Sequence, residues 1–342
     1  MDVVTRRPRS RARNLALGIA LPLLLGLALV AFLVYLTGPT AAFDTLARLR
    51  AWEGGTLLLV AFASSAFAAC ALRVILGRYG HRVSAWLLFR LSILAFAVGW
   101  LVPSGYVAGF PVAAYVLKRR GVPFGRGLAS FLIERFFELG AYALVLPTVL
   151  LSGLASGAAL LLGVFAPLAA VALVVLDLSF GWRLGRRSLR LLVPRVPHLV
   201  APALERGIDF LATVSSFFES SLLLLLAALA LSVLAIGASF VRALLTAQFL
   251  HLPLGAPQVA LLLAFSLLVL AIPFLPGSIG VYEGGMVGFF RLLGRPSAEG
   301  VAYAMTVHGV ELMVAAVGFV FLVQLGMSLA TAREVSTSPP PP

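Results

Sequence analysis

Charged side chains are scarce in this sequence. Only 11% of the residues are Asp, Glu, Lys or Arg, against about 25% in an average soluble domain. Hydrophobic residues make up 61%, and the mean hydropathy is +1.06. The longest polar stretch, at about 180–220, is still apolar in part, so a separate soluble domain has nowhere to fold. The composition therefore indicates an integral membrane protein without a catalytic domain in water.

Cysteine and clustered metal ligands are nearly absent as well. The one cysteine, Cys70, lies in an apolar stretch, which excludes an intramolecular disulfide. The four histidines are scattered and have no Cys or His partner at the spacing of metal ligands. No glycine-rich phosphate loop follows a strand. We therefore expect no metal, no cofactor and no enzymatic activity, and we do not expect nucleotide-driven pumping.

Acidic residues are few, and the positive charge is unevenly placed. The sequence has 26 Lys and Arg against 13 Asp and Glu, a formal net charge of +13. The basic residues gather in four segments, 1–14, 77–85, 118–127 and 180–206. The segments 37–54, 151–156 and 248–257 are neutral or nearly so. Such alternation is typical of cytoplasmic loops rich in Lys and Arg. It predicts cytoplasmic N- and C-termini and argues against a nucleic-acid surface; Arg291 and Arg295 are exceptions that fall on the outside.

Apolar runs of about 20 residues, long enough to span a bilayer as a helix, occur six times. They lie at about 15–36, 56–76, 128–150, 157–179, 220–247 and 300–327. Two further runs are broken by proline and glycine, with arms at about 86–101 and 104–117, and at about 258–274 and 278–293. An arm of about 16 residues is only about 24 Å long as a helix, so we predict re-entrant hairpins. Two thin full spans would leave the topology unchanged.

The two broken runs are related by a spacing of 173 residues. Pro103 and Pro276 are one matched pair. The same register matches Gly121 with Gly294, Pro123 with Pro296, Gly127 with Gly300, Ala129 with Ala302, and Glu138 with Glu311. Each half has three full crossings, an odd number, so the second half must be inverted relative to the first. Paired interrupted helices in two halves indicate a transport site. We predict that the two tips meet near the midplane: Pro103 and Gly105 in the first, and Pro276, Gly277 and Gly280 in the second.

The predicted fold is therefore all-α: an integral membrane protein with an inverted repeat of six full transmembrane helices and two re-entrant helical hairpins. We expect a basic cytoplasmic N-terminus (1–14), a first repeat (15–150, hairpin 86–117), a second repeat (157–327, cytoplasmic loop 180–219, hairpin 258–293) and a disordered cytoplasmic tail (328–342). The 180–210 segment is expected to be a linker or a surface amphipathic helix. Its prolines would confine such a helix to the part before Pro194.

Ionisable side chains within predicted spans are costly in lipid and are therefore candidates for function. Glu134, Arg135 and Glu138 share a helix face, and the last two are spaced to pair. His308 and Glu311 repeat that basic–acidic spacing at the equivalent positions of the second half. These residues either lock helices into the bundle or serve head-group binding or proton coupling, and we favour the second interpretation.

Two other charged residues allow more than one interpretation. Glu283 follows the second tip within a glycine-rich stretch, which suits a site for a cationic or zwitterionic head group or a proton. It could equally cap the N-terminus of the second hairpin arm, and the two roles are compatible. Arg242 lies near the outer end of a span and can snorkel, so we interpret it as an anchor. Ser239 is interpreted as a packing residue.

Two stretches resemble the transmembrane region of lysylphosphatidylglycerol synthases. They run from Gly121 to Glu138, with Glu134-Arg135-Phe136-Phe137-Glu138 at the end, and from Leu275 to Gly284, reading LPGSIGVYEG. The resemblance is strongest over about 98–150 and 270–325 and extends across about 15–330. It implies a domain that moves lipids between leaflets. The aminoacyl-transfer domain of the synthases has no counterpart here, so transferase activity is not expected. The family's charged pair is missing from Gly109–Tyr115, and Tyr282 stands where an arginine commonly precedes the glutamate.

These observations together predict a lipid translocase of the bacterial cytoplasmic membrane, which moves a lipid or a lipid-linked head group between leaflets. One alternative is a non-enzymatic membrane partner or regulator of a lipid-modifying enzyme, and another is an integral-membrane lipid enzyme. Expected partners are membrane lipids, including anionic or isoprenoid-linked ones, and a second copy of the chain or a lipid-synthesis enzyme. No nucleic acid is expected.

Overall fold

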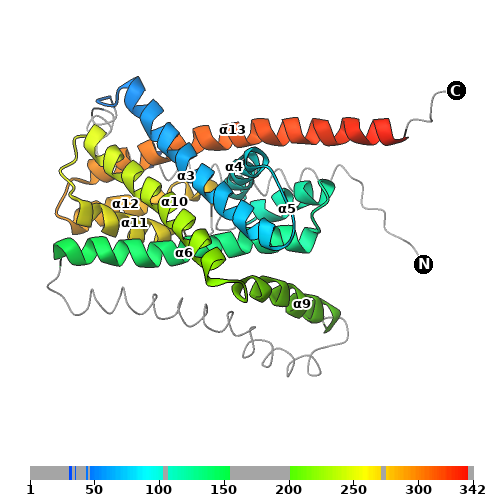
Figure 1. Cartoon of the computed structure of the whole chain (residues 1–342). Coiled ribbons are helices and arrows are strands. Elements are labelled where there is room, and N and C mark those ends of the chain that lie inside the picture. Colours follow the sequence, from blue (N-terminus) through cyan, green and yellow to red (C-terminus); the bar gives the residue numbers. More distant parts are fainter. Residues whose placement is uncertain are drawn as a thin grey trace, which may run out of the picture.

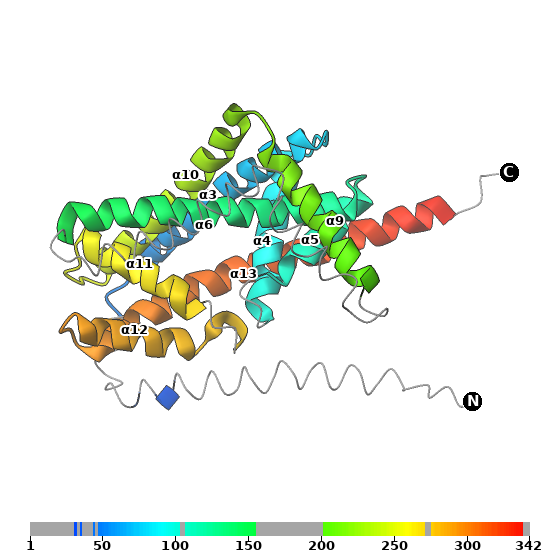
Figure 2. The ribbon, with the colours of Figure 1, turned by 90° about the horizontal axis from the view of Figure 1, so that it is seen from below.

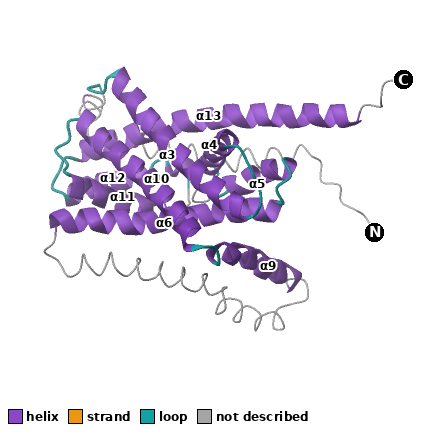
Figure 3. Cartoon of the chain, in the orientation of Figure 1, coloured by secondary structure: helices purple, strands orange, loops and turns teal. Residues whose placement is uncertain are grey.

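The computed structural model describes residues 31–32, 35, 44, 47–102, 107–154, 201–270 and 275–337. Every regular element within these residues is a helix, as Figure 3 shows. The helical class predicted from the sequence is therefore confirmed for this part of the chain. The predicted span at 157–179, most of the one at 15–36, and the first tip with Pro103 and Gly105 lie outside the described residues.

The main elements are labelled in Figure 1. They are α3 (Ala51–Arg78), α4 (Ala85–Leu101), α5 (Gly109–Arg119), α6 (Phe124–Leu154), α9 (Ala201–Phe218), α10 (Leu222–Phe249), α11 (Ala256–Leu270), the 3₁₀ turn η2 (Pro276–Ser278), α12 (Val281–Leu292) and α13 (Ser297–Thr337). Within the described ranges, three helices are long and apolar enough to cross a membrane: α3, α10 and the Ser297–Leu325 part of α13. These helices cover three of the six predicted spans. A fourth predicted span falls on α6, which carries several charged side chains in its first half.

The turn that follows each interrupted segment has the same structure in both halves. α5 and α12 end at Arg119 and Leu292, and α6 and α13 begin at Phe124 and Ser297, so each pair of boundaries is 173 residues apart. Gly121 and Gly294 have positive φ angles of 87° and 71°. This left-handed conformation is common one residue beyond a helix end, where glycine meets no steric penalty. The matched glycines and prolines of the sequence therefore mark a repeated helix–turn–helix unit.

Contacts between helices are reciprocal between the first half (α3–α6) and the second half (α10–α13). In each half the broken segment's two helices contact each other, and the last helix packs on the second of them. Across the halves, α4 packs against α13 while α6 packs against α11, and α3 packs against α10. Figure 2 shows α11 between α6 and α12. Each half therefore covers an apolar face that the other half cannot cover by itself.

The second break lies against the first half. The backbone at Gly277 has φ of 59° and sits so close to Trp100 of α4 that a Cβ atom there would lie 2.5 Å from the indole ring. η2 as a whole contacts α4. The predicted second tip (Pro276, Gly277 and Gly280) is therefore non-α-helical and buried at the junction of the halves, with Pro276 and Gly277 both inaccessible. Because the first tip lies outside the described residues, its meeting with the second tip stays a prediction.

Two segments differ from expectation. No helix was predicted after Pro194, and that prediction was wrong: α9 spans Ala201–Phe218 and packs on α6. Pro202 is tolerated there because it lies in the first turn, where its missing N–H has no helical partner to lose. In addition, α13 continues to Thr337, past the predicted end at 327 and into the tail expected to be disordered. Its last residues include helix formers such as Ala332 and Glu334, and no proline follows before Pro339.

Candidate functional site

A cavity of about 270 Å³ lies between the two halves. Side chains of α3, α4, α5 and α6 line it from the first half, and side chains of α10, α11, α12 and α13 line it from the second. The charged and polar residues in its wall are Ser64, Ser65, Ser92, Glu134, Arg135, Glu138, Tyr142, Ser239, Arg242, Thr246, Ser266, Tyr282, Tyr303 and Glu311. In a bundle of apolar helices this wall is the place where a polar group can be held.

Three charged side chains of the cavity come from two turns of α6. Arg135 forms an ion pair with Glu138, and both side chains are partly buried. The spacing of three residues had predicted this pair, and the structure confirms it. Glu134 lines the same cavity, and its residue is only 9% exposed. Glu134 has no ion-pair partner among the described residues, since Arg135 pairs with Glu138 instead.

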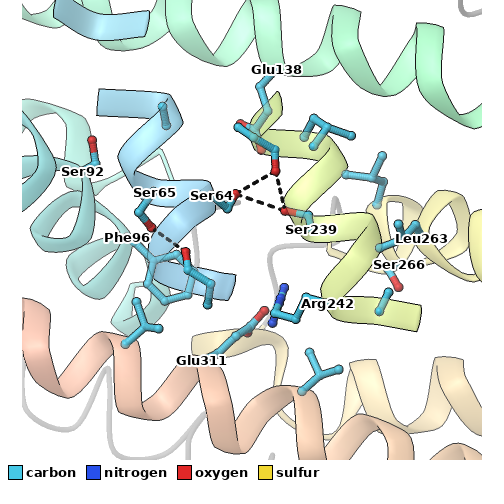
Figure 4. A pocket seen from close by; sticks show the side chains of 18 of the residues that line it. Ser64, Ser65, Ser92, Phe96, Glu138, Ser239, Arg242, Leu263, Ser266 and Glu311 are labelled. Carbon is cyan, nitrogen blue, oxygen red and sulfur yellow. Dashed lines mark hydrogen bonds between the residues drawn. The ribbon is translucent and has the colours of Figure 1, made fainter. Parts of the chain in front are cut away.

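Arg242 of α10 and Glu311 of α13 point toward one another across the cavity, as Figure 4 shows. Glu311 was predicted as a site residue, but Arg242 was interpreted as a snorkelling anchor, and that interpretation was wrong. Its position near the end of a predicted span suggested the anchor. In the structure the side chain instead lines the cavity between the halves. The cavity thus holds two arginines and three glutamates.

Serine hydroxyls join α3 and α10 at one side of the cavity. Ser64 Oγ donates to the carbonyl oxygen of Ala235 at 2.9 Å and lies 3.2 Å from Ser239 Oγ. Ser92 of α4 also lines the cavity, and its buried Oγ has no hydrogen-bond partner in the described part of the chain. Ser239 therefore packs the crossing, as predicted, and also contributes to the polar wall. Isolated serines in apolar spans were the sequence signal for this wall.

Glu283 and His308 form a second buried pair that does not line the cavity. His308 Nδ1 lies 2.7 Å from Glu283 Oε1, and the two residues are 9% and 2% exposed. The backbone N–H of Gly280 donates to Glu283 Oε2 at 2.6 Å, so the predicted capping role of Glu283 is confirmed. Tyr282 lines the cavity, and its ring centroid lies 5.0 Å from that of His308, so the pair lies next to the cavity wall.

The equivalent contact in the first half uses different chemistry. Phe110 of α5 occupies the position that matches Glu283, and it stacks on Phe131 of α6 with ring centroids 5.6 Å apart. His308 matches Arg135, yet the two differ in partner: His308 binds Glu283, whereas Arg135 binds Glu138. Arg135 thus pairs within its own helix, whereas His308 binds a carboxylate on the neighbouring helix.

Sequence reasoning thus located four of the cavity's charged residues, Glu134, Arg135, Glu138 and Glu311, and missed Arg242. It also missed the aromatic hydroxyls of Tyr142, Tyr282 and Tyr303, which line the cavity. Tyrosines in apolar spans are commonly packing residues, so only the fold could assign them to this wall. No group of His, Cys, Asp and Glu able to hold a metal is present within the described ranges.

The exceptional arginines outside the predicted cytoplasmic segments have local partners. Arg295 binds Glu299 through two hydrogen bonds of 2.6 and 2.9 Å, and Arg291 donates to Ser297 Oγ at 2.6 Å. These contacts connect the end of α12 to the first turn of α13. They explain the positive charge there as part of the turn between two helices.

Comparison with known proteins gives one family. The family model of the lysylphosphatidylglycerol synthase TM region matches residues 19–318, which include every described residue that lines the cavity. Neither the curated proteins nor the solved structures contain a significant match. The match covers most of the chain and both of its halves. The chain therefore belongs to the family of the lysylphosphatidylglycerol synthase transmembrane region.

Proposed function

We propose that this protein is a lipid translocase, which moves a lipid or a lipid-linked head group between the two leaflets of a membrane. The observation that carries the proposal is the polar cavity between the halves, with Arg135, Arg242 and their carboxylate neighbours inside an otherwise apolar bundle. Membership of a lipid-related membrane family supports it. Because charged groups are costly at membrane depth, a cavity of this kind is expected to serve a polar passenger.

The two arginines suit a phosphate group. A guanidinium binds phosphate through two parallel hydrogen bonds, and the low dielectric around it strengthens the contact. A volume of about 270 Å³ lies at the low end for small-molecule sites. It would hold a head group and exclude acyl chains, which would stay in the surrounding lipid. The serine and tyrosine hydroxyls of the wall would replace the water that the head group loses.

The reciprocal contacts favour the inverted repeat as the architecture behind this function. An odd number of crossings in each half inverts the second half, and inverted repeats place the substrate site at their interface. We propose that α4 with α5, and α11 with α12, are re-entrant hairpins that enter from opposite sides. The cytoplasmic N- and C-termini and a location in the bacterial cytoplasmic membrane are part of the same proposal.

The proposed activity involves no chemical change of the lipid. Its partners are membrane lipids, anionic or isoprenoid-linked ones among them, and a second copy of the chain or an enzyme of lipid synthesis is a further proposed partner. A translocase of this kind would act after the reaction that attaches the head group.

Translocation can be measured directly in proteoliposomes. Fluorescent phospholipids in the inner leaflet are protected from dithionite, so movement to the outer leaflet appears as an added bleaching phase. We expect the wild-type protein to accelerate this phase. Arg242→Gln should slow it by about tenfold or more, the loss expected when one charge-assisted contact of about 1.5 to 3 kcal/mol is removed.

Arg291→Gln is the matched control, because Arg291 is exposed and lies on the turn side of α12, away from the cavity. It should keep the wild-type rate. If folded wild-type protein accelerates no lipid in a panel of anionic, zwitterionic and isoprenoid-linked lipids, the translocase proposal is wrong.

A further inference from the structure

The charges in the cavity do not balance. Arg135 is paired with Glu138, and Arg242 faces Glu311, which leaves Glu134 as a third carboxylate without a cation of its own. Glu134 is nine-tenths buried, and its residue lines the cavity. An ionised carboxylate in such surroundings is costly, so any further negative charge that enters the cavity favours uptake of a proton by Glu134.

The described residues that line the cavity include no other neutralising partner for Glu134. α6 itself supplies Arg135, Glu138 and Tyr142, α10 supplies Arg242, α12 supplies Tyr282, and α13 supplies Tyr303 and Glu311. The cavity-lining residues of α3, α4, α5 and α11 are serines and apolar side chains. Glu138 lies four residues after Glu134, one helical turn away, so two negative charges there would repel one another.

An anionic head group would change this balance. A phosphate that binds the Nη1 side of the Arg135 guanidinium competes with Glu138, because the Glu138 carboxylate accepts from that nitrogen. Release of Glu138 would put a second unpaired carboxylate one turn from Glu134 and would add the charge of the phosphate. The bound state would then carry a large negative excess at membrane depth. Uptake of a proton from water on the loading side reduces this excess.

We propose that Glu134 carries a proton together with an anionic head group, so that lipid movement is coupled to proton movement in the same direction. The proton is taken from water on the side where the head group enters, rides on a carboxylate oxygen of Glu134 and returns to water on the other side. A lipid with one negative charge and one proton cross as a neutral pair. This inference rests on the proposed lipid translocation and names its coupling.

The test uses the whole protein in liposomes with fluorescent phosphatidylglycerol and a pH difference across the membrane. For one proton per lipid, a difference of one pH unit can sustain up to about a tenfold excess of the lipid on the alkaline side. We expect an excess of several-fold in that direction, its reversal when the gradient is reversed, and its collapse with a proton ionophore. Glu134→Gln should move lipid without responding to the gradient. Glu134→Asp, which keeps an ionisable group, should respond.

Glu219→Gln serves as the matched control, since this carboxylate is exposed and lies between α9 and α10, outside the cavity lining. It should behave as the wild type.

If wild-type protein moves the lipid but ignores the gradient, the coupling is wrong and the translocase proposal stands. Gradient-driven lipid movement by Glu134→Gln would equally overturn the proposed proton coupling. If Glu134→Gln fails to transport only those lipids that carry an amine, such as phosphatidylethanolamine, Glu134 binds the head group and carries no proton. Failure of wild-type movement without any gradient would reject the translocase proposal itself.

Discussion

At the scale of single residues, the ionisable groups fall into two sets with different surroundings. Glu134, Arg135, Glu138, Arg242 and Glu311 line the cavity. The second set, Glu283 and His308, lies next to the cavity wall and holds the start of α12 against α13. The first set is placed to meet a passenger, whereas the second fixes the geometry of the break. A substitution in the first set should therefore affect transport, whereas a substitution in the second set should affect stability.

Loss of the Glu283 carboxylate should destabilise the protein strongly. Glu283→Ala leaves His308 and the N–H of Gly280 without their buried acceptor, and removal of one partner from a buried pair costs about 3 to 5 kcal/mol. Glu283→Gln retains an acceptor of similar shape and should cost about 1 kcal/mol. Thermal unfolding of purified protein in detergent micelles measures both.

The double variant Glu283→Ala with His308→Ala is the internal control for this prediction. Because the two residues are in contact, its destabilisation should be smaller than the sum of the single effects. Equal unfolding temperatures for Glu283→Ala and the wild type would contradict the assigned role.

The sequence predicted one of the two buried pairs and could not predict the other. Arg135 and Glu138 are three residues apart on one helix, so helical geometry alone brings them together. Glu283 and His308 are 25 residues apart and lie on different helices, so their contact depends on how α12 packs against α13. Arg242 was misassigned for a related reason, since only the packing of α10 among the other helices shows that this residue lines the cavity.

At the scale of elements, the two interrupted segments share their helix boundaries and turns but differ in the side chains that pack between the helices. The boundaries of the second arms and the turns with Gly121 and Gly294 repeat at 173 residues, which proline and glycine made visible in the sequence. The contact between second arm and last helix is a stack of aromatic rings in the first half and an ion pair in the second. Matching of the two halves in sequence finds the turns, because turns need particular residues. It misses the side chains packed between the helices, because several kinds of contact can fill that space.

The contact between η2 and α4 gives a prediction at this scale. Gly277→Ala places a Cβ atom 2.5 Å from the Trp100 ring, in addition to a left-handed backbone that L-residues adopt at a cost of about 1 kcal/mol. Overpacking typically costs about 1 to 3 kcal/mol more. We expect a lower unfolding temperature and a higher protease sensitivity near the second break.

Trp100→Phe provides the matched test. The atoms closest to the added Cβ are Cε2, Cζ2 and Nε1 of the indole, and the smaller phenylalanine ring fills less of this space, so Gly277→Ala combined with Trp100→Phe should recover part of the packing loss and retain the backbone part. If the double variant is as unstable as the sum of the single variants, the two residues do not pack as described.

At the scale of the whole molecule, the reciprocal contacts make the halves interdependent. α4 packs on α13 and α6 packs on α11, so neither half can bury its own apolar faces alone. A chain expressed as two fragments, 1–190 and 191–342, tests this directly, because the cut falls in the predicted cytoplasmic loop. Each fragment alone should be degraded in the membrane, and the two expressed together should accumulate and purify as a complex.

Fragment 1–190 carrying Trp100→Ala provides a graded comparison, since it weakens the contact with η2 and should lower the yield of the complex. Accumulation of either fragment alone, at the level of the intact protein and with normal protease resistance, would show that a half is self-sufficient. That outcome would contradict the interdependence.

The close approach of α4 and α13 also has a consequence in time. Gly318 comes so near to α4 that a Cβ atom there would lie 2.6 Å from the carbonyl oxygen of Ile93. Those two positions are separated by more than 200 residues of chain. At ribosomal rates of about 5 to 20 residues per second, roughly 10 to 45 seconds pass between the synthesis of Ile93 in α4 and that of Gly318 in α13. During every round of biosynthesis the face of α4 that contacts Gly318 is therefore exposed to lipid, or covered by an insertion factor, until the last helix of the same chain is made.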